Sequence, residues 1–401
     1  MSTSQETRRP RAEAVVDLAA IRHNVRTLRA HVGPAEVMVV VKADGYGHGI
    51  LPSARAARAA GASWLGVAVV EEALALRAAG DTGPILCWLA VPGERLADAV
   101  AADIDLSASA VWMVDELVTA AGIAGRPVRV HLKVDTGLNR SGATAADWTD
   151  LVTAAAKARA AGHLEIIGVW SHLACSDEPG HPANAAQVAA FADALEVAAR
   201  HGVQPPLRHL ANSGGTLALP DTWYDLVRPG IASYGLSPFG PARPSAELGL
   251  RPAMTLRAGL AVVKRVGAGE GVSYGHTYVT SQPTTLGLVP LGYGDGIPRH
   301  ASGRGPVLAA GKRRTIAGRV CMDQFVLDLD GDDAAAGDDV VLFGPGDGGE
   351  PTADDWAVAA ETINYEIVTR IGPRVPRCYT GGDPRHDPRH DPRPDTGEVT
   401  G

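Results

Sequence analysis

The chain contains the stretch Val37-Met38-Val39-Val40-Val41-Lys42-Ala43-Asp44-Gly45-Tyr46-Gly47-His48, in which an apolar run ends at a lysine and a glycine-rich turn. The run Val37–Val41 is mostly β-branched and predicts a strand that is buried on both faces. A lysine beside such a strand is costly unless its amine has a chemical role. A partly desolvated amine loses its proton more easily and can form a Schiff base. Lys42 is therefore a candidate nucleophile, and a lysine that reaches solvent at the strand end is the alternative.

Similar short runs recur over the first part of the chain, and between most of them lie Ala-, Leu-, Arg- and Glu-rich segments that predict helices. This alternation is typical of parallel β/α units. The strand candidates are Val37–Val41, Trp64–Val69, Pro84–Leu89, Ile104–Ser107, Val128–Val134, Ile166–Trp170, Leu207–Leu210 and Leu226–Val227. The helix candidates include Ile21–His31, Glu71–Ala79, Ala145–Ala161 and Ala185–Arg200. Eight strand candidates favour a closed (β/α)8 barrel of the TIM type over an open sheet.

The second part of the chain has a different pattern. Glycine and proline turns separate strand-like runs, and no helix is expected before Ala353–Thr362; the runs are Met254–Val266, Thr284–Leu291, Thr315–Leu329 and Asp339–Phe343. The pattern predicts a mainly-β domain with one late helix, so that the fold class is α/β with a barrel followed by this domain.

The expected domains are a barrel over residues 12–245 and a β domain over residues 250–380, with the boundary in Ser237–Pro252. The early run at about residues 12–17 is a candidate to pair with the β domain instead of the barrel. Residues 1–11 are polar, and residues 381–401 contain Asp-Pro-Arg repeats with no apolar residue before Val399. Both tails are predicted to be disordered, because they have nothing to bury.

The composition is typical of a globular protein, with 401 residues, 45% hydrophobic and 20% charged residues, and a net charge of -8. The length favours two domains. Because the charge is negative, neither nucleic acid nor an anionic membrane surface is expected as a partner. No apolar stretch approaches the ~20 residues that span a bilayer, and the N-terminus lacks the apolar core of a signal peptide. The four cysteines form no C-x-x-C pair, so we expect no metal site, no disulfide framework and a cytoplasmic location.

Polar side chains follow most of the predicted barrel strands, at the ends where catalytic groups gather in such barrels. Taken singly, His172 is more often a structural histidine and Arg228 a salt-bridge partner. Together they belong to a ring of cations and donors on one face: Lys42, Trp88, Asp135–Arg140, Ser171, His172, Asn212–Gly215 and Arg228–Gly230. The loops after the last two strands of such barrels often hold phosphate. A Schiff-base lysine opposite a phosphate site predicts pyridoxal 5'-phosphate (PLP) as the cofactor.

Several motifs, in this order along the chain, resemble those of the alanine racemase family. They cover roughly residues 12 to 380, and their combination is specific, although each one alone is weak. They are Val41-Lys42-Ala43-Asp44-Gly45-Tyr46-Gly47-His48-Gly49, Lys133-Val134-Asp135-Thr136-Gly137-Leu138-Asn139-Arg140, Trp170-Ser171-His172, Asn212-Ser213-Gly214, Val227-Arg228-Pro229-Gly230-Ile231, Val272-Ser273-Tyr274-Gly275-His276, Gly318-Arg319-Val320-Cys321-Met322-Asp323 and Ile363-Asn364-Tyr365.

The resemblance implies an enzyme that interconverts L-alanine and D-alanine with PLP and two bases, supplying D-alanine for peptidoglycan. Lys42 would carry PLP and serve as one base, and Tyr274 would act on the opposite face of the substrate. Arg228 would donate to the pyridine nitrogen, which would stay unprotonated, so the cofactor would be a weaker electron sink. His172 would lie beside the ring and link to Arg228 or Tyr274. Arg140 would bond the phenolic oxygen of the cofactor and assist with the substrate carboxylate.

The resemblance also implies further cofactor and substrate contacts. The phosphate would be bound by Tyr46, Ser213, Gly230, Ile231 and Tyr365. Trp88 and Asn212 would contact the cofactor, Met322 and Asp323 would lie near the substrate carboxylate, and Lys133 matches a lysine that is carbamylated in some members. The family forms a head-to-tail homodimer in which Tyr274 and Met322 reach the site of the second subunit.

Departures from the family pattern are small: Asp44-Gly45 replaces the more usual Asn-Ala, and Trp88 is larger than the common aliphatic residue. Other functions stay open. A racemase of broader specificity, for serine, lysine or arginine, would have similar motifs. A PLP-dependent decarboxylase of the same architecture would bring an acidic partner for the pyridine nitrogen, where this chain has Arg228. A non-catalytic PLP-carrying barrel would need neither the β domain nor Tyr274.

Overall fold

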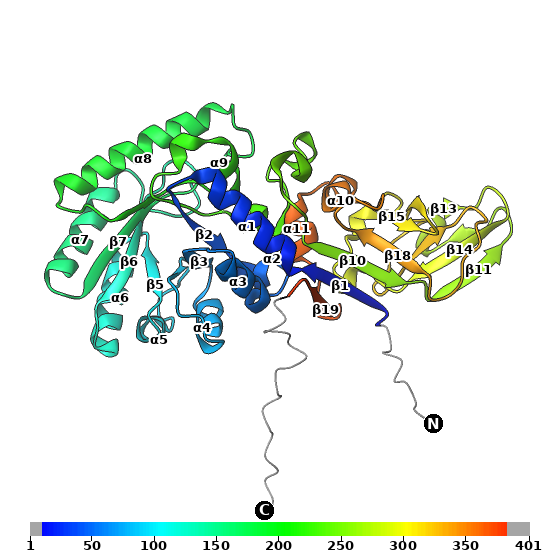
Figure 1. The fold of residues 1–401 in the computed structure, drawn as a ribbon, viewed down its shortest axis with the longest axis horizontal. Helices are drawn as coiled ribbons and strands as arrows, with labels where there is room; N and C mark the ends of the chain where they lie inside the picture. The colour runs from blue at the N-terminus through cyan, green and yellow to red at the C-terminus, as the bar shows by residue number, and fades with distance from the viewer. Residues whose placement is uncertain (1–9, 383–401) are drawn as a thin grey trace, which may run out of the picture.

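The computed structural model describes residues 10–382, and these form a barrel of strands and helices next to a strand-rich domain (Figure 1). Most of the predicted tails, residues 1–9 and 383–401, lies outside the described residues. Arg11 was predicted to be in the first tail, but its carbonyl accepts a hydrogen bond from the Gly259 amide and its guanidinium pairs with Asp295. Arg11 is thus held by the β domain.

The barrel is built of eight parallel strands in the order β8-β7-β6-β5-β4-β3-β2-β9. Their bounds are β2 Glu36–Val40, β3 Trp64–Val67, β4 Ile85–Cys87, β5 Asp105–Ala108, β6 Val128–Lys133, β7 Leu164–Trp170, β8 Leu207–His209 and β9 Leu226–Val227. No regular ladder joins β8 to β9, but backbone hydrogen bonds from Asp225 to Arg208 and from Arg228 to Ala211 connect them. The predicted TIM-type barrel is confirmed, with its closure made by these single bonds.

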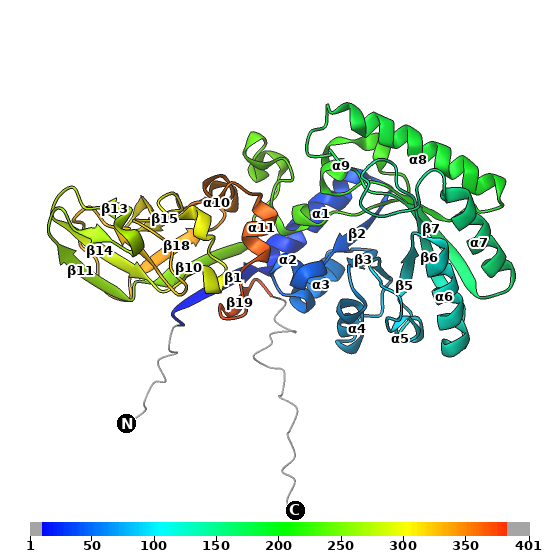
Figure 2. The same ribbon diagram turned by 180° about the vertical axis from the view of Figure 1, so that it is seen from behind.

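Helices surround the strands on the outside of the barrel (Figures 1 and 2). They are α1 Leu18–Val32, α3 Ile50–Ala59, α4 Val70–Ala78, α5 Leu96–Ala101, α6 Val111–Ala124, α7 Trp148–Ala160, α8 Pro182–Arg200 and α9 Ser213–Ala218. In α1, the side chains of Ile21, Val25, Leu28 and Val32 are buried, and this spacing of three or four residues places them on one face. The side chain of Asp17 caps the helix by accepting a hydrogen bond from the Ala19 amide.

The β domain consists of three small sheets. A six-stranded sheet has the order β16-β15-β18-β10-β1-β19, a three-stranded sheet has the order β11-β14-β17, and β12 pairs with β13. The strands are β1 Ala12–Asp17, β10 Met254–Gly259, β11 Val262–Val266, β12 Gly271–Val272, β13 Tyr278–Val279, β14 Thr284–Val289, β15 Pro306–Ala309, β16 Lys312–Thr315, β17 Phe325–Asp328, β18 Asp339–Phe343 and β19 Arg377–Thr380. β1 therefore pairs with β10 and β19 and not with the barrel strands.

Three expectations for the β domain were wrong in detail. Met254–Val266 is not one run, because the chain leaves the six-stranded sheet after β10 and enters the three-stranded sheet as β11. Thr315–Leu329 is also divided, since β16 and β17 are separated by a loop that contains the Arg319–Asp323 motif. The single late helix is in fact two, α10 Ala353–Ala360 and α11 Asn364–Thr369.

Short 3-10 turns make up many of the remaining connections: η1 Pro220–Thr222, η2 Ile231–Tyr234, η3 Gly240–Ala242, η4 Ser245–Leu248, η5 Tyr274–His276, η6 Tyr293–Asp295 and η7 Arg299–Ala301. Two of them, η3 and η4, lie in the predicted boundary segment. Polar contacts hold the two domains together nearby: the Asn24 amide donates to the Arg251 carbonyl and accepts from the Arg251 amide.

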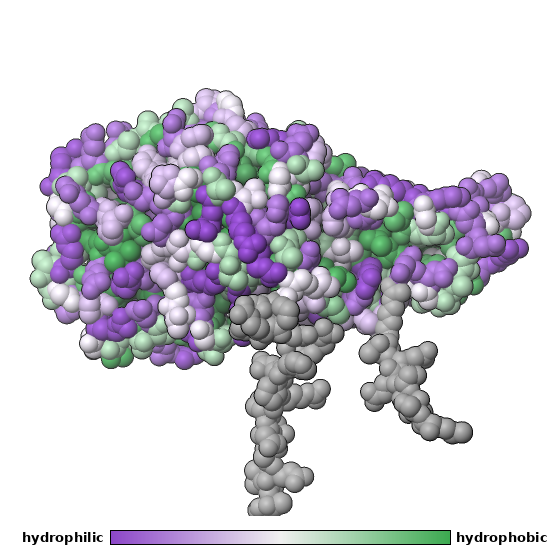
Figure 3. Space-filling view, viewed as in Figure 1, coloured by the Kyte–Doolittle hydropathy of each residue, from purple (hydrophilic) through white to green (hydrophobic). Residues whose placement is uncertain are grey.

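On the face in Figure 3, apolar patches alternate with polar residues over both domains. Within residues 10–382, none of the helices has the length and apolar character needed to cross a membrane.

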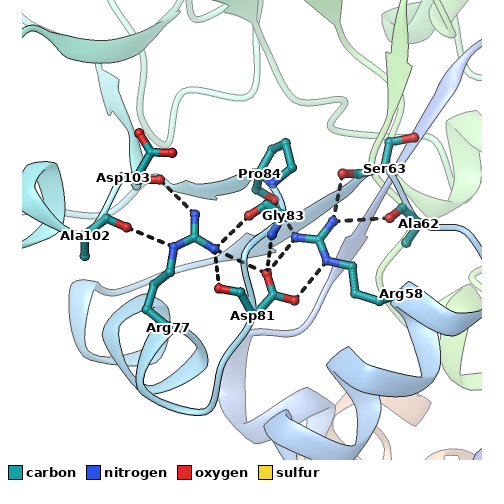
Figure 4. A network of polar contacts seen from close by, with 9 residues as sticks. All are labelled: Arg58, Ala62, Ser63, Arg77, Asp81, Gly83, Pro84, Ala102 and Asp103. Carbon is teal, nitrogen blue, oxygen red and sulfur yellow. Dashed lines mark hydrogen bonds and ion pairs between the residues drawn. The ribbon is translucent and has the colours of Figure 1, made fainter.

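At the end of the barrel where the strands begin, the loops that lead from α3 to β3 and from α4 to β4 share a polar network (Figure 4). The Asp81 carboxylate accepts hydrogen bonds from Arg58 and Arg77. Arg58 also donates to the carbonyls of Ala62, Ser63 and Pro84, and Arg77 to those of Gly83, Ala102 and Asp103. The network joins neighbouring loops at the end of the barrel where the strands begin.

Candidate active site

The turn after β2 has an unusual backbone. The segment α2 (Lys42–Tyr46) is not a right-handed helix, because Ala43, Asp44, Gly45 and Tyr46 all have φ between 53° and 61°. Residues other than glycine rarely adopt this left-handed conformation, and each costs of order 1 kcal/mol. Polar contacts hold the turn: Glu72 accepts a hydrogen bond from the Ala43 amide at 2.6 Å, and Asp44 accepts one from the Ile50 amide at 2.8 Å. The turn fixes the direction in which Lys42 leaves the strand.

Lys42 is half-buried, and its Nζ lies over the ring of Trp88, 5.9 Å from the ring centroid. Burial lowers the pKa of Lys42, and the nearby charge of Arg140 lowers it further, while Glu72 opposes the shift. A larger share of the amine is therefore unprotonated than in a free lysine. This is the state in which an amine attacks a carbonyl.

Arg228 directly follows β9 and is almost completely buried. Its NH2 atom donates to the carbonyls of Ser171 at 2.7 Å and Leu210 at 3.1 Å, and lies 3.4 Å from Nδ1 of His172. Burial lowers the pKa of Arg228 to about 9, a value that still leaves it charged at neutral pH. Burial also lowers the pKa of His172 well below its ordinary value, and Arg228 is the largest charge acting in the same direction. His172 is therefore a neutral imidazole beside a guanidinium.

Lys133, at the end of β6, is a second buried amine. Its Nζ donates to Ser141 and lies 4.3 Å from the centroid of the Trp170 ring. Burial, followed by the charges of Arg228 and Arg140, lowers the pKa of Lys133 to about 7. Lys42, Lys133, Arg140 and Arg228 thus lie close enough to repel one another, which favours an anionic ligand between them.

The loops after β8 and β9 meet at Ser213. Its Oγ accepts hydrogen bonds from the amides of Gly230 at 2.9 Å and Ala232 at 3.3 Å. A Cβ on Gly230 would lie 2.1 Å from Oη of Tyr46, so only glycine allows this approach. The ring of Tyr46 is 5.0 Å from that of Tyr234 and 6.3 Å from that of Tyr365. Hydroxyls and backbone amides thus converge at one place, next to the buried Ile231.

Other predicted site residues lie elsewhere or are engaged in other contacts. The side-chain oxygen of Asn212 caps α9 by accepting from the Gly215 amide, and it also accepts from Ser176. Tyr274, Met322 and Asp323 lie in the β domain, where the first two are 70% and 55% exposed. Asp323 accepts a hydrogen bond from Arg374 at 2.8 Å. Figures 1 and 2 show β13, which follows the Tyr274 turn, well away from the barrel strands of the same chain.

Three buried or anchoring residues near the site did not stand out in the sequence: Glu72, His131 and His209. Glu72 holds the Lys42 turn, and Nδ1 of His209 accepts a hydrogen bond from NH1 of Arg228 at 3.1 Å. A signal existed for the histidines, since a polar residue inside a strand that is otherwise buried on both faces requires a partner. The partner itself comes from another strand, and pairing between strands cannot be read from one strand's pattern.

Fold and site together define a class of protein: a two-domain barrel enzyme with a half-buried lysine among cations at the ends of the barrel strands. Comparisons with known proteins identify the family. The model of the alanine racemase N-terminal domain matches residues 16–238, and the model of the C-terminal domain matches residues 253–379.

Two curated relatives support the same assignment. The alanine racemase of Frankia casuarinae is 60% identical over 369 residues, which are 92% of this chain and 96% of the relative. That of Thermobifida fusca is 58% identical over 371 residues, 92% of this chain and 98% of the relative. Among solved structures, the alanine racemase from D-cycloserine producing Streptomyces lavendulae has a TM-score of 0.93 and 58% identity, covering 94% of this chain and 99% of its own. The chain belongs to the alanine racemase family.

Proposed function

We propose that this chain interconverts L-alanine and D-alanine with PLP bound at Lys42, and that it supplies D-alanine for peptidoglycan. The observation that carries the proposal is a half-buried lysine with a lowered pKa, in a group of cations beside a cradle of hydroxyls and amides. The relatives and the family models are named alanine racemase, so alanine as the substrate and PLP as the cofactor are proposed together.

The residues fit PLP at each of its functional groups. Lys42 would bind the aldehyde carbon. The phosphate would be surrounded by Ser213, Tyr46, Tyr365, Ile231 and Gly230. Gly230 has no side chain and so leaves room for Tyr46. Arg228 would donate to the pyridine nitrogen, with His172 beside it, and Trp88 would lie along the ring. Asn212 would support the phosphate loop through its cap. When bound, PLP withdraws electrons from the α-carbon of the amino acid and makes the α-proton acidic.

The proton is moved by groups of the chain. Lys42 Nζ would exchange it on one face of the substrate and Tyr274 Oη on the other, so that removal and return occur on opposite faces. Arg140 would hold the substrate carboxylate, with Met322 and Asp323 at the same end. Lys133, with its pKa near 7, has the reactivity needed for carbamylation, which would place a carboxylate beside Arg140.

The proposed roles require a second copy of the chain. Tyr274 is 70% exposed, and β13, the strand that follows its turn, lies away from the barrel strands of the same chain (Figure 2). An exposed tyrosine and an exposed methionine on the β domain are suited to cover the site of a partner. We infer a homodimer in which each β domain completes the other subunit's site.

The first test is an assay of the purified protein with PLP and L-alanine, with D-alanine measured by chiral chromatography beside serine, lysine and arginine. Conversion of alanine supports the proposal, and faster conversion of another amino acid would replace alanine as the substrate. Release of carbon dioxide without racemisation would instead indicate a decarboxylase, although Arg228 at the pyridine nitrogen argues against it.

The second test locates the cofactor. Reduction with borohydride should fix PLP on Lys42, and Lys42→Ala should lose both the adduct and the visible absorbance of the bound cofactor. Lys133 is the informative competitor, since it is also buried with a lowered pKa. A stable adduct on Lys133 in the unmodified chain would reject Lys42 as the attachment site.

A further inference from the structure

A line of polar side chains crosses the interior of the barrel and ends at Arg228. Asp105 begins β5, His131 lies within β6, and His209 ends β8. NH1 of Arg228 is 3.1 Å from Nδ1 of His209, and Nε2 of His209 is 2.9 Å from Nδ1 of His131. Nε2 of His131 is 3.2 Å from Oδ2 of Asp105. The contacts join the start of one strand to the catalytic end of another.

These groups are deeply buried: Asp105 is 1% exposed, and both histidines are 0% exposed. Burial of polar groups is costly unless every one is paired. Pairing is complete here, because Arg129, the second residue of β6, donates to Asp105 through Nε at 2.8 Å and NH2 at 3.2 Å. The Arg129 side chain is 32% exposed and connects the line to solvent at the far end of the barrel.

A glycine makes space for this line. A Cβ on Gly168, in β7, would lie 2.3 Å from Nδ1 of His131. Glycine weakens the interior of a strand and is found there where another group must approach closely. The ring of Trp170, on the same strand, stacks on His209 with centroids 5.6 Å apart and an interplanar angle of 7°. The positions of both imidazoles are thus fixed from the side as well as from the ends.

The direction of each hydrogen bond follows from the two ends. A guanidinium only donates, so Nδ1 of His209 must accept and its proton is on Nε2. That proton is donated to Nδ1 of His131, which leaves the proton of His131 on Nε2, facing the carboxylate of Asp105. Only one arrangement satisfies all the contacts, and in it both histidines are neutral. Burial and the charge of Arg228 accordingly lower the pKa of His209 well below its ordinary value.

We propose that Asp105 and His131 are positioning residues for the racemase reaction, which hold Arg228 through His209 in the orientation and charge state that the pyridine nitrogen requires. The proposal rests on the proposed function for the contact between Arg228 and PLP. Four groups already engage two of the nitrogens of Arg228: the carbonyls of Ser171 and Leu210, and the imidazoles of His172 and His209. No protein group in the described chain accepts from its Nε, which stays available to a ligand.

The separation of the Asp105 carboxylate from the Arg228 guanidinium explains why two histidines lie between them. A carboxylate directly on Arg228 would neutralise it and bring a negative charge close to the cofactor ring. Here two neutral imidazoles separate Asp105 from Arg228, and Arg129 compensates the charge of Asp105. The line therefore fixes the guanidinium without reducing its charge, so the pyridine nitrogen would stay unprotonated.

The first experiment determines the tautomers directly and does not depend on the cofactor. The protein is produced with 15N-labelled histidine, and the ring-nitrogen signals are recorded by NMR on the protein as purified. The signals of His131 and His209 are assigned by substituting each residue singly. We expect both histidines to be neutral with the proton on Nε2. A proton on Nδ1 of either residue, or a charged imidazole at neutral pH, would overturn the proposed direction of the line, whatever the enzyme catalyses.

The second experiment measures reaction selectivity, the number of transamination events per racemisation event, in Asp105→Asn. Loss of a charged hydrogen-bond acceptor is worth about one order of magnitude, so we expect the ratio to rise roughly tenfold. The matched control is Asp81→Asn, which also removes a carboxylate paired with arginines near the start of the strands but has no connection to Arg228. The ratio does not depend on the amount of folded enzyme, so mere destabilisation leaves it unchanged.

A pair of substitutions at the second residue separates positioning from packing. His131→Gln keeps an acceptor and a donor on one amide, whereas His131→Leu keeps only the volume. We expect selectivity close to the unmodified chain in His131→Gln and poor selectivity in His131→Leu. Equal ratios in Asp105→Asn and Asp81→Asn, or in the two His131 variants, would show that the line contributes only to stability.

Discussion

His48 is a buried histidine at the junction of the two domains, next to Tyr46, which is proposed to contact the cofactor phosphate. Its Nδ1 lies 2.9 Å from the Tyr46 carbonyl and 3.1 Å from the Gly45 carbonyl, so this nitrogen must carry the proton. Its Nε2 is buried and accepts no hydrogen bond from the described residues. A second proton there would be buried without a partner, and burial lowers the pKa of His48 to about 4.

This shift predicts a sensitivity to acid. The unfolded chain takes up the proton near pH 6.5 and the folded chain only near 4, so the free energy of unfolding falls as the pH drops through this interval. Above about pH 6.5 His48 costs the folded chain almost no stability. By about pH 5, protonation of His48 in the unfolded chain has lowered the free energy of unfolding by about 2 kcal/mol. In His48→Asn, which keeps a donor for the Tyr46 carbonyl, the fall between about pH 7.5 and about pH 5 should be smaller by this amount. Urea unfolding at the two pH values measures it.

Replacement of the exposed His201 by asparagine serves as the control and should leave the pH dependence unchanged. If His48→Asn and the unmodified chain lose the same free energy on acidification, other buried groups such as His172 and His209 account for the acid sensitivity.

At the level of single residues, the sequence predicted groups whose position follows from the end of a strand. Lys42 and Arg228 are of this kind, because Lys42 lies two residues after the end of β2 and Arg228 directly follows β9. The structure places both among the cations of the site. His131 and His209 could not be found in this way. Their role depends on a contact between two residues that are 78 positions apart on different strands, and on the absence of a side chain at Gly168.

Among the elements, the loops before the barrel strands offer a test of stability. Asp81 joins Arg58 and Arg77, and the side chains are only 13%, 20% and 14% exposed (Figure 4). Asp81→Asn leaves two arginines with an incomplete set of acceptors, and we expect it to lower the free energy of unfolding by about 2–3 kcal/mol. The control is Asp98→Asn, which breaks an exposed pair with Arg95 and should cost less than about 0.5 kcal/mol. Similar values for the two variants in urea unfolding would mean that the network adds little beyond a surface pair.

The same comparison of elements explains which parts of the fold were predictable. All eight barrel strands were found near their observed bounds, because a strand buried on both faces is a short apolar run between polar segments. The strands of the β domain were harder to predict from the sequence. Met254–Val266 reads as one strand, although β10 and β11 belong to different sheets, and β19 was missed since Arg377–Thr380 lacks an apolar run. Sheet membership depends on partners distant in the chain, such as the parallel pairing of β19 with β1.

At the scale of the whole molecule, the two parts of the proposed chemistry lie in different domains. Lys42 and Arg228 belong to the barrel, whereas Tyr274 and Met322 are exposed on the β domain. Figures 1 and 2 show the strand that follows Tyr274 in the outer part of the β domain, at the opposite end of the molecule from β6 and β7. We therefore expect the two proposed bases of one site to come from two copies of the chain.

This separation predicts complementation between two inactive variants. Lys42→Ala and Tyr274→Ala homodimers should each lack racemase activity, and Tyr274→Ala should still bind PLP and exchange the α-proton of D-alanine through Lys42. A heterodimer of the two contains one site with both bases intact and one site with neither, so it should recover about half the wild-type activity. Co-expression with two different tags and sequential purification gives verified heterodimers, and two differently tagged Lys42→Ala chains serve as the control. Verified heterodimers without activity would place Tyr274 in its own subunit's site, and a fully active Tyr274→Ala homodimer would remove this tyrosine from the mechanism.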